Sequence, residues 1–366
     1  MFLNPFPNAI GLDISDLSIK VVQLRNLSLR RRRPAFELAA ARITALPHGL
    51  TIDGELQHPE KLRKYIDHLL RPNTKTRRPI GTRWVVASVP DNQSFLKLVR
   101  LDKSPDDIIE EDILSAAKKH VPIIEDDYHL DWQIMPNHSG ASANTEVLLG
   151  AIPKQIAEMY TYLLESVGLS VIALELRALA TARSVAPRAM GGDEGAHAIL
   201  DIGATATTLT IYDHNHIQFS SSFPYSGELL TTAIAQKLHL SYDEAEMSKK
   251  TKGLEYHQSP VWSTLSHFTD QLVAQIQKTL LFYISHFPDA HKVGGIILCG
   301  GGATLKRLDK ILSLKLKIPC RLGDVWQNLS ARRPIPLPQE QSLAFATAVG
   351  LALRAADNPL FHGDMV

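Results

Sequence analysis

Residues 198–218, AILDIGATATTLTIYDHNHIQ, decide the fold of this chain. Residues 198–202 are an apolar run that contains one acid, Asp201, and residues 207–212 are a second run rich in threonine and β-branched residues. Gly203 and three small residues separate the runs, so the pattern predicts two antiparallel strands joined by a tight turn. An acid in an otherwise buried strand is costly unless it has a partner, which marks this hairpin as a candidate site.

Residues 10–24, IGLDISDLSIKVVQL, repeat this pattern near the start of the chain. Asp13 takes the place of Asp201, Ser15 takes that of Gly203, and a second β-branched run follows. The copies lie about half a chain apart, which indicates a duplicated lobe, because solenoid repeats have periods of roughly 20–50 residues. A chain of 366 residues is also too long for one small core. The sequence therefore predicts an α/β fold of two related lobes.

Composition excludes several classes of protein. Lysine and arginine number 39 against 38 acids, a net charge of +1, so no nucleic-acid surface is expected. The two cysteines specify no disulfide framework, and no apolar run is long enough to cross a bilayer, which favours a cytoplasmic protein. The four arginines at residues 30–33 are expected in a solvated loop, with contact to anionic lipid or nucleic acid as the alternative.

Two hairpin turns that face each other can bind phosphate groups from both sides. Small and hydroxyl residues leave backbone N–H groups open to phosphate oxygens, and an acid at a strand end can hold the waters of a Mg²⁺ ion. A third element, residues 295–302, is a strand that enters the turn Gly300-Gly301-Gly302, and it matches neither the dinucleotide fingerprint nor the P-loop. Each turn alone is also common in proteins that bind no nucleotide. The prediction of a nucleotide site therefore depends on the order of the three turns along the chain.

Residues 35–146 are expected to form a compact α/β insert in the first lobe. Strands are predicted over residues 83–89 and 94–101, and a helix that begins at Ser104 and ends before Pro122. The expected units are a first lobe (1–34, 147–190 and 343–366), the insert (35–146) and a second lobe (195–342) with a helical subdomain at residues 225–290.

The order of these elements resembles the actin-like ATPase superfamily. Over nearly the whole chain it is similar to the PilM family of type IV pilus assembly, a branch that has an insert on the first lobe as the cell-division protein FtsA does. Besides the two hairpins, the motifs that carry this resemblance are LSAAKKHVP (114–122), YHLDWQIM (128–135), PYSGELLTTAIAQKL (224–238), AEMSKK (245–250) and LCGGGATLKRLDKIL (298–312).

The resemblance implies a cytoplasmic protein that binds ATP with Mg²⁺ and captures the cytoplasmic N-terminal tail of a PilN-like inner-membrane protein. It would link that protein to the pilus machinery and lie at the inner membrane through this partner, without inserting into the membrane itself. The pilus assembly ATPase and a second copy of the chain are further expected partners. The tail is expected to add to an exposed strand edge between the insert and the first lobe.

The resemblance also implies the residues of the site. By position they are the first phosphate loop (Asp13, Ser15, Ser18 and Lys20), the second phosphate loop (Asp201, Gly203 and Thr205), the nucleoside contacts (Glu246 and Lys249) and the adenosine turn (Gly300, Gly301 and Gly302). The same resemblance implies that Asp13 and Asp201 hold Mg²⁺ through water.

Two departures from the family pattern bear on activity. Ser15 stands where the family usually has glycine, and its Cβ disfavours a turn with positive φ, so Ser15→Gly is expected to preserve or tighten ATP binding. A residue that orients the attacking water is expected after the strand at residues 147–152, yet residues 153–155 offer no suitable side chain. We therefore expect an ATP-binding protein with at most slow ATPase activity.

Other functions of the same fold stay open at this point. The main alternative is a scaffold that binds only its partner and has a decayed nucleotide site. A sugar or acyl kinase would need a catalytic acid that faces a small substrate, and none is identified. A chaperone would need a further substrate domain, and a membrane filament would need an amphipathic C-terminal anchor, which the last residues are too short and too broken to form.

Overall fold

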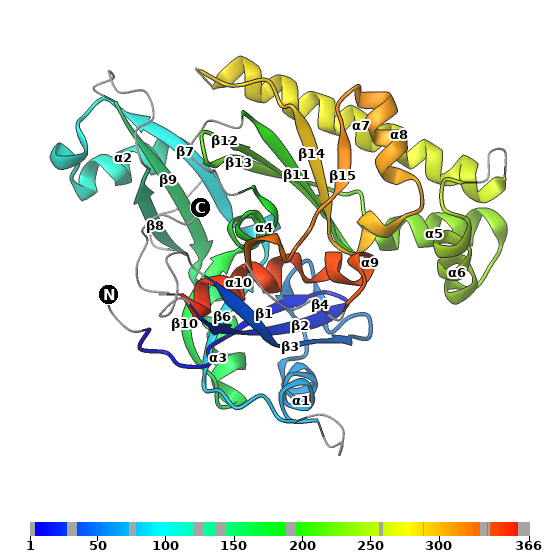
Figure 1. Cartoon of the computed structure of the whole chain (residues 1–366), viewed down its shortest axis with the longest axis horizontal. Helices are drawn as coiled ribbons and strands as arrows, with labels where there is room; N and C mark the ends of the chain where they lie inside the picture. Colours follow the sequence, from blue (N-terminus) through cyan, green and yellow to red (C-terminus); the bar gives the residue numbers. More distant parts are fainter. Residues whose placement is uncertain are drawn as a thin grey trace.

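The structure is a computed structural model that describes residues 4–27, 35–72, 78–120, 127–135, 144–187, 195–255, 259–287, 289–329, 335 and 337–357. The arginine run at 30–33 lies outside the described residues. Two sheets form the body of the molecule, and the helices α4 (Arg177–Val185) and α10 (Ala346–Ala356) lie between them (Figure 1).

The first sheet is built on the earlier of the two predicted hairpins. Strands β1 (Ile10–Ser15) and β2 (Ser18–Asn26) are antiparallel, with Asp13 opposite Lys20 and Ser15 opposite Ser18. The sheet has the order β10-β6-β1-β2-β3, and β6 is parallel to β1. The three added strands are β3 (Phe36–Ala45), β6 (Trp84–Val89) and β10 (Ser170–Leu176).

The second sheet repeats this arrangement. Strands β11 (His197–Ile202) and β12 (Thr207–Asp213) form the second predicted hairpin, with Asp201 opposite Thr208. Strand β14 (Gly295–Cys299) is parallel to β11, as β6 is to β1, and the order β15-β14-β11-β12-β13 matches that of the first sheet. The flanking strands are β13 (His216–Phe223) and β15 (Cys320–Leu322). This correspondence confirms the predicted fold of two related lobes.

The strands within residues 35–146, the predicted insert, divide between the two sheets. Strands β7 (Phe95–Leu101), β9 (Thr145–Pro153) and β8 (Tyr128–Ile134) extend the second sheet beyond β13, and α2 (Glu110–His120) packs against them. In contrast, β3 and β6, which the predicted boundaries 35–146 include, pair with β2 and β1 of the first sheet. The local alternation of apolar residues does not show which sheet a strand will join. We therefore propose residues 95–153 as the insert.

Helix α2 also begins later than predicted. Residues 105–107 form a separate 3₁₀ turn, in which the Ser104 hydroxyl donates to the Asp107 carboxylate at 2.6 Å. The Asp112 carboxylate accepts from the backbone N–H of Ile109 at 3.1 Å, so a side chain from inside α2 satisfies a donor at its start. Ser104, the predicted N-cap, therefore precedes the short turn, and its side chain forms no capping hydrogen bond there.

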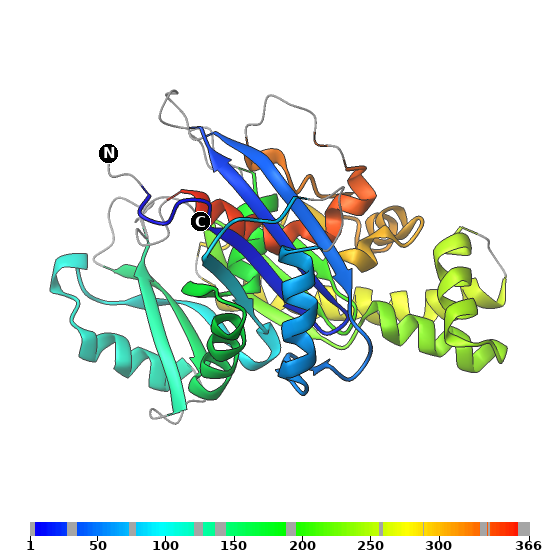
Figure 2. The same ribbon diagram turned by 90° about the horizontal axis from the view of Figure 1, so that it is seen from below.

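The remaining helices cover the sheets. Small residues let α4 and α10 cross closely: a Cβ added to Gly350 would lie 1.6 Å from the carbonyl oxygen of Ala180. The insert and the helix pair α5 (Gly227–Leu238) and α6 (Tyr242–Lys252) lie at opposite ends of the molecule (Figure 2). Among the described residues, no helix has the length and hydropathy that a membrane crossing requires. The other helices and the small two-stranded sheet are α1 (Pro59–Leu70), α3 (Lys154–Ser166), α7 (Pro260–His286), α8 (Leu308–Leu316), α9 (Gln339–Ser342), β4 (Thr51–Ile52) and β5 (Glu55–Leu56).

Candidate functional site

A cavity of about 320 Å³ lies between the lobes, where the turns of both hairpins meet. Most of the predicted site residues line it, namely Asp13, Ser15, Ser18, Lys20, Asp201, Gly203, Thr205, Gly300 and Gly301. Gly302, Glu246 and Lys249 are not among its lining residues. Segments far apart in the sequence therefore converge on one cleft.

Asp13 is a buried, ionised and fully paired acid. Its carboxylate accepts hydrogen bonds from the Lys20 ammonium (3.0 Å), the Ser15 hydroxyl (3.0 Å) and the Ser88 hydroxyl (2.8 Å). The Nε atom of Arg177 lies 3.4 Å from the same group. Burial opposes ionisation, but Lys20 and Arg177 outweigh it and hold the pKa of Asp13 well below its ordinary value. Asp13 therefore has protein partners that compensate its charge, and its role in holding Mg²⁺ through water stays a prediction.

Asp201 has the opposite surroundings, although it occupies the equivalent position of the second hairpin. Within the described residues, its carboxylate accepts no hydrogen bond and forms no ion pair. Burial raises the pKa of Asp201 to about 6, and the negative charge of Asp13 adds to that rise, while Arg177 opposes it. Of the two acids predicted to hold Mg²⁺, Asp201 is the one whose oxygens are available.

Arg177 and Asp91 are charged residues of the cleft that the sequence analysis does not predict. Arg177, the first residue of α4, donates to the backbone carbonyl of Ile14 and also lies beside Asp13. Asp91 follows β6 and accepts from the backbone N–H of Ala178 and the Thr208 hydroxyl, both at 3.3 Å. Burial raises the pKa of Asp91 above its ordinary value, although the nearby Arg177 opposes the rise. The lining of the cleft thus includes one guanidinium, the Lys20 ammonium and five aspartates (Asp13, Asp16, Asp53, Asp91 and Asp201).

Asp91 offers a second candidate for the water-orienting residue that the sequence analysis expects near residues 153–155. The sequence analysis places that residue at 153–155, after β9, but β9 belongs to the insert and none of those residues lines the cavity. In the first sheet, β6 is the parallel neighbour of β1, and the residues that follow β6 enter the cavity. Asp91 is therefore the acid to consider for this role.

The local structure also overturns the argument about Ser15. Ser15 is the last residue of β1, pairs with Ser18 and has no positive φ, so Asp16 and Leu17 form the turn. Glycine would gain no conformational freedom there that the turn requires. The Ser15 hydroxyl instead accepts from Lys20 at 3.1 Å and donates to Asp13, so Ser15→Gly would remove a member of this cluster.

The third turn requires glycine for close contact with the second hairpin. Gly300 has a φ of +80°, and a Cβ added there would lie 2.3 Å from the Asp201 carboxylate and 2.4 Å from the Ile202 carbonyl oxygen. A Cβ added to Gly302 would lie 2.3 Å from the Ile202 side chain. Gly302 therefore packs behind the turn, whereas Gly300 holds the backbone against Asp201.

Glu246 and Lys249 lie behind the second loop and outside the cavity. Their side chains form an ion pair of 2.6 Å on α6. The Lys249 ammonium donates to the Gly227 carbonyl and to the Thr231 hydroxyl, both at 2.7 Å. Gly227 in turn donates its N–H to the Gly203 carbonyl at 3.1 Å. In the structure these two residues thus support the loop at Gly203.

Asp16 connects the two lobes directly across the cleft. Its carboxylate accepts from the Thr205 hydroxyl at 2.7 Å and from the backbone N–H of Gly54 at 3.0 Å. Farther out, the His48 ring lies 2.9 Å from the Glu228 carboxylate, which places a second contact between the lobes. The geometry described here is therefore that of a closed cleft.

A second cavity of about 450 Å³ lies between the insert and the first lobe. On one side it is lined by consecutive residues of β8, Asp131, Trp132 and Gln133, and on the other by every residue of β10 from 171 to 176. Strands β8 and β10 are the outer strands of their sheets. Alternate side chains of a strand point to opposite faces, so lining by consecutive residues means that the strands present their edges to the cavity.

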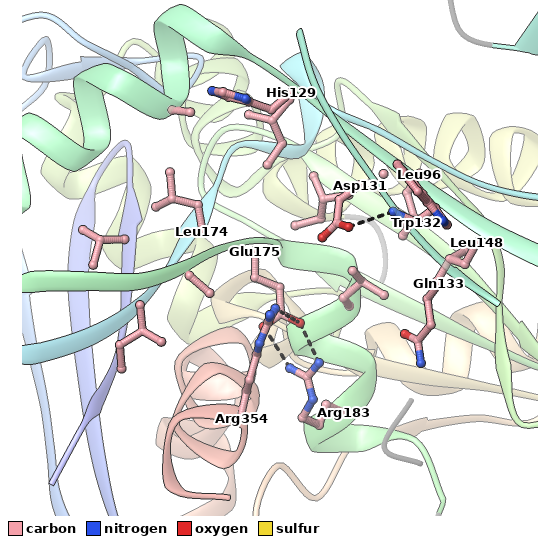
Figure 3. Close-up of a pocket in the computed structure, with 18 of the residues that line it drawn as sticks. Leu96, His129, Asp131, Trp132, Gln133, Leu148, Leu174, Glu175, Arg183 and Arg354 are labelled. Carbon is pink, nitrogen blue, oxygen red and sulfur yellow. Dashed lines mark hydrogen bonds and ion pairs between the residues drawn. The ribbon is translucent and has the colours of Figure 1, made fainter. Parts of the chain in front are cut away.

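One end of this cavity carries a buried charge cluster. The Glu175 carboxylate accepts from both terminal nitrogens of Arg183, at 2.9 and 2.5 Å, and lies 3.5 Å from Arg354 (Figure 3). Burial opposes the ionisation of Glu175, but the two guanidinium groups outweigh it and lower the pKa of Glu175. Asp131 lies on the facing strand β8 (Figure 3). The cavity therefore offers backbone edges, apolar walls and a charged end.

Comparison with known proteins agrees with this architecture. One chain of a solved PilM-PilN type IV pilus biogenesis complex is 23% identical to this one, with a TM-score of 0.80 over 96% of this chain and 100% of that chain. The ethanolamine utilization protein EutJ from Carboxydothermus hydrogenoformans is 15% identical, with a TM-score of 0.55 over 96% and 92% of the two chains. MreB 5 of Spiroplasma citri bound to AMPPNP is 13% identical, with a TM-score of 0.54 over 94% and 95%. These structures show the actin-like fold. A family model for type IV pilus assembly protein PilM matches residues 11–356, and the chain therefore belongs to that family.

Proposed function

We propose that this protein is a nucleotide-binding scaffold of type IV pilus assembly. In this proposal, ATP with Mg²⁺ binds in the cleft between the lobes, and the cytoplasmic tail of a PilN-like inner-membrane protein binds in the cavity between the insert and the first lobe. The protein would then lie at the inner membrane through that partner. The observation that carries the proposal is the pair of strand edges, β8 and β10, that face each other across this cavity.

The composition of the cleft supports nucleotide binding. Hydroxyls and the Lys20 ammonium on one side, and the small-residue loop at Gly203 on the other, provide donors for phosphate oxygens. The Asp201 carboxylate would hold Mg²⁺ through water, and the ion would neutralise phosphate charge. Asp13 fits this role less well because Lys20 and Arg177 already pair with it. MreB 5 of Spiroplasma citri, which has the same fold, is bound to AMPPNP.

Turnover is expected to be slow at most. Asp91 lies in the cleft, but its carboxylate is held by the Ala178 N–H and the Thr208 hydroxyl. These two contacts fix the direction of the acceptor positions that remain on Asp91, and positioning is the main contribution of the protein to phosphoryl transfer. Binding without efficient hydrolysis is therefore the activity that this site supports best.

The partner cavity suits an extended peptide. A strand placed between β8 and β10 would form main-chain hydrogen bonds with one or both edges, and the apolar walls would receive alternate side chains. One chain of the solved PilM-PilN complex is similar to this protein over 96% of the present chain, which supports a PilN-like partner. A tail that becomes ordered on binding loses conformational entropy, so a modest affinity is expected.

A side chain that fills the cavity tests this assignment. Gly150 of β9 lines the cavity, and a Cβ added there would lie 3.5 Å from Leu176, an ordinary contact, so Gly150→Leu should fold and occupy the space of the peptide. Gly81→Leu is the matched control, because an added Cβ at Gly81 meets no atom within 4 Å. Fluorescence anisotropy with a labelled peptide of the PilN-like tail would measure binding.

Gly150→Leu is expected to weaken peptide binding by more than about tenfold, equal to 1.4 kcal/mol. The control should bind like the parent protein, and both variants should bind nucleotide equally well. Unchanged peptide binding by a folded Gly150→Leu protein would rule out this cavity as the binding site. Failure of the parent protein to bind the tail would rule out the partner.

A further inference from the structure

A cluster of one aspartate and two histidines lies at the end of β12 that is remote from the nucleotide cleft. Asp213 ends β12, His214 is the first residue of the turn to β13, and His291 follows α7. One possible metal-binding atom from each of these residues lies within 4.8 Å of the other two. None of the three lines either cavity described above.

The structure holds the Asp213 carboxylate firmly in place. Its side chain is fully buried, and it accepts hydrogen bonds from the Tyr283 hydroxyl and from the backbone N–H groups of His214 (2.8 Å) and His291 (2.9 Å). Tyr283 belongs to the buried face of α7. Carboxylates that bind metal ions are commonly oriented by such outer hydrogen bonds, which also keep their oxygens in a fixed direction.

The two imidazoles are placed around this carboxylate by their backbones. His214 and Asn215 have φ values of 51° and 65°, so the turn is left-handed at both positions. The Nε2 atom of His214 lies 3.7 Å from Asp213 Oδ2 and 3.0 Å from the carbonyl oxygen of Asp289. The Nδ1 atom of His291 lies 2.9 Å from Asp213 Oδ1, and the centroids of the two imidazole rings are 4.6 Å apart.

These separations are close to those of a tetrahedral metal site. Ligand atoms at about 2.0–2.1 Å from a Zn²⁺ ion are about 3.3 Å from one another. The two nitrogen–oxygen distances of 3.7 and 2.9 Å lie on either side of this value, and the three candidate atoms lie within 4.8 Å of one another, so shifts of up to roughly 1.5 Å would complete the site. The Asp213 side chain is fully buried, whereas 43% of the His291 side chain is exposed, so the site is open to solvent on the side of His291. An ion can enter from the side of His291, and the Asp289 carbonyl oxygen or a water molecule can fill the fourth position.

We propose that Asp213, His214 and His291 bind one divalent transition-metal ion of the Zn²⁺ type. Two imidazoles and one carboxylate are the donor set that suits Zn²⁺ and Co²⁺ rather than Mg²⁺ or Ca²⁺, which prefer oxygen ligands. The ion joins the β12–β13 turn to the segment after α7. The Asp289 carboxylate of that segment lies 3.3 Å from Arg100 of β7, so the ion also strengthens the junction between the second lobe and the insert.

The test uses the full chain after removal of metal with a chelator. Co²⁺ is added, and its visible absorption reports four-coordinate binding, while competition with Zn²⁺ gives the relative affinity. His214→Asn and His291→Ala each remove one ligand, and asparagine tolerates the left-handed backbone at position 214. His286→Ala is the control, since this histidine lies on the last turn of α7 and its ring contacts Phe282 outside the cluster. A control is required because the chain contains 15 histidines.

One equivalent of Co²⁺ is expected to bind the parent protein and the His286→Ala variant. His214→Asn and His291→Ala should each weaken this binding by more than the roughly 10–100-fold that loss of an outer-shell partner causes. Zn²⁺ should raise the thermal unfolding temperature of the parent protein and not that of His291→Ala. Absence of stoichiometric binding by the parent would overturn the proposal and identify the cluster as a hydrogen-bonded network only. If His214→Asn and His291→Ala bind Co²⁺ as tightly as the parent protein, the proposal is overturned as well.

Discussion

Asp201→Asn is expected to stabilise the free protein while it removes Mg²⁺-dependent nucleotide binding. Burial raises the pKa of Asp201 from 3.8 to about 6, which corresponds to roughly 3 kcal/mol at 1.36 kcal/mol per pKa unit. Asp201 is only partly buried, and water in the cleft screens its charge, so we expect the neutral amide to increase the free energy of unfolding by roughly 1–2 kcal/mol near pH 8. Asparagine has nearly the same shape, so packing against Gly300 should persist.

The pH dependence of this stability difference tests whether the charge of Asp201 causes it. The pKa of Asp201 is higher in the folded than in the unfolded protein, so the parent protein loses stability as the pH rises through about 6 and regains it toward pH 4. The advantage of Asp201→Asn should therefore be largest near pH 8 and should shrink by more than half near pH 4.5. Urea unfolding of both proteins without nucleotide, at these two pH values, measures the difference.

Calorimetry with ATP and Mg²⁺ provides the second half of this test. The parent protein should bind, and Asp201→Asn should lose the part of the affinity that depends on Mg²⁺. Ser15→Gly serves as a comparison and should bind no more tightly than the parent, because Ser15 lies within β1. A variant that is less stable than the parent near pH 8, or that binds Mg²⁺ and ATP equally well, would refute the reasoning. No binding by the parent would mean a decayed nucleotide site and leave the stability argument intact.

Two substitutions test how the cleft and the lobe junction are held together. Lys20→Met should lower the free energy of unfolding by about 3 kcal/mol near neutral pH, because it leaves buried Asp13 with Arg177 as its remaining cation. Lys61→Met, at an exposed position, is the control and should change the free energy of unfolding by less than about 0.5 kcal/mol. Urea unfolding measures both. The pKa of Asp13 is depressed in the folded protein, so its pairing contributes stability above the ordinary value of 3.8, and the loss in Lys20→Met should fade only as the pH falls below that value. A loss that does not fade there would contradict the pairing. Gly350→Ala should lower the free energy of unfolding by about 2–3 kcal/mol, because its Cβ would lie 1.6 Å from the Ala180 carbonyl oxygen, whereas Gly301→Ala, with no atom within 4 Å of the added Cβ, should be nearly neutral in thermal unfolding.

The fold could be predicted because its decisive features are local. Each hairpin consists of two largely buried strands around a short turn, and the same pattern at residues 10–24 and 198–218 shows the duplication directly. The limits of the insert could not be found in the same way. Strand β6 has an ordinary apolar pattern, and its pairing with β1 joins residues more than seventy positions apart. Only the assembled sheet shows which strands belong to the insert.

The same distinction between local and tertiary features applies to the residues of the candidate site. Asp13, Lys20 and Asp201 stand in short motifs whose spacing places them at strand ends, so sequence comparison finds them. Arg177 begins an ordinary helix, and Asp91 follows a strand that the sequence analysis assigns to the insert. Their approach to the cleft results from tertiary packing, for which neither segment carries a local signal.

The two acids illustrate how duplication can separate roles within one site. Asp13 and Asp201 occupy equivalent positions of equivalent hairpins, yet their cross-strand partners differ: Lys20 lies opposite Asp13, and Thr208 lies opposite Asp201. Directly opposed residues on neighbouring strands share a face and contact each other, so the lysine compensates the first acid, while the Thr208 hydroxyl turns to Asp91 and leaves the second acid without a partner. We infer that this difference between the hairpins, together with the contacts of Ser15, Ser88 and Arg177 to Asp13, makes Asp13 the structural acid and leaves Asp201 as the better candidate to bind an ion.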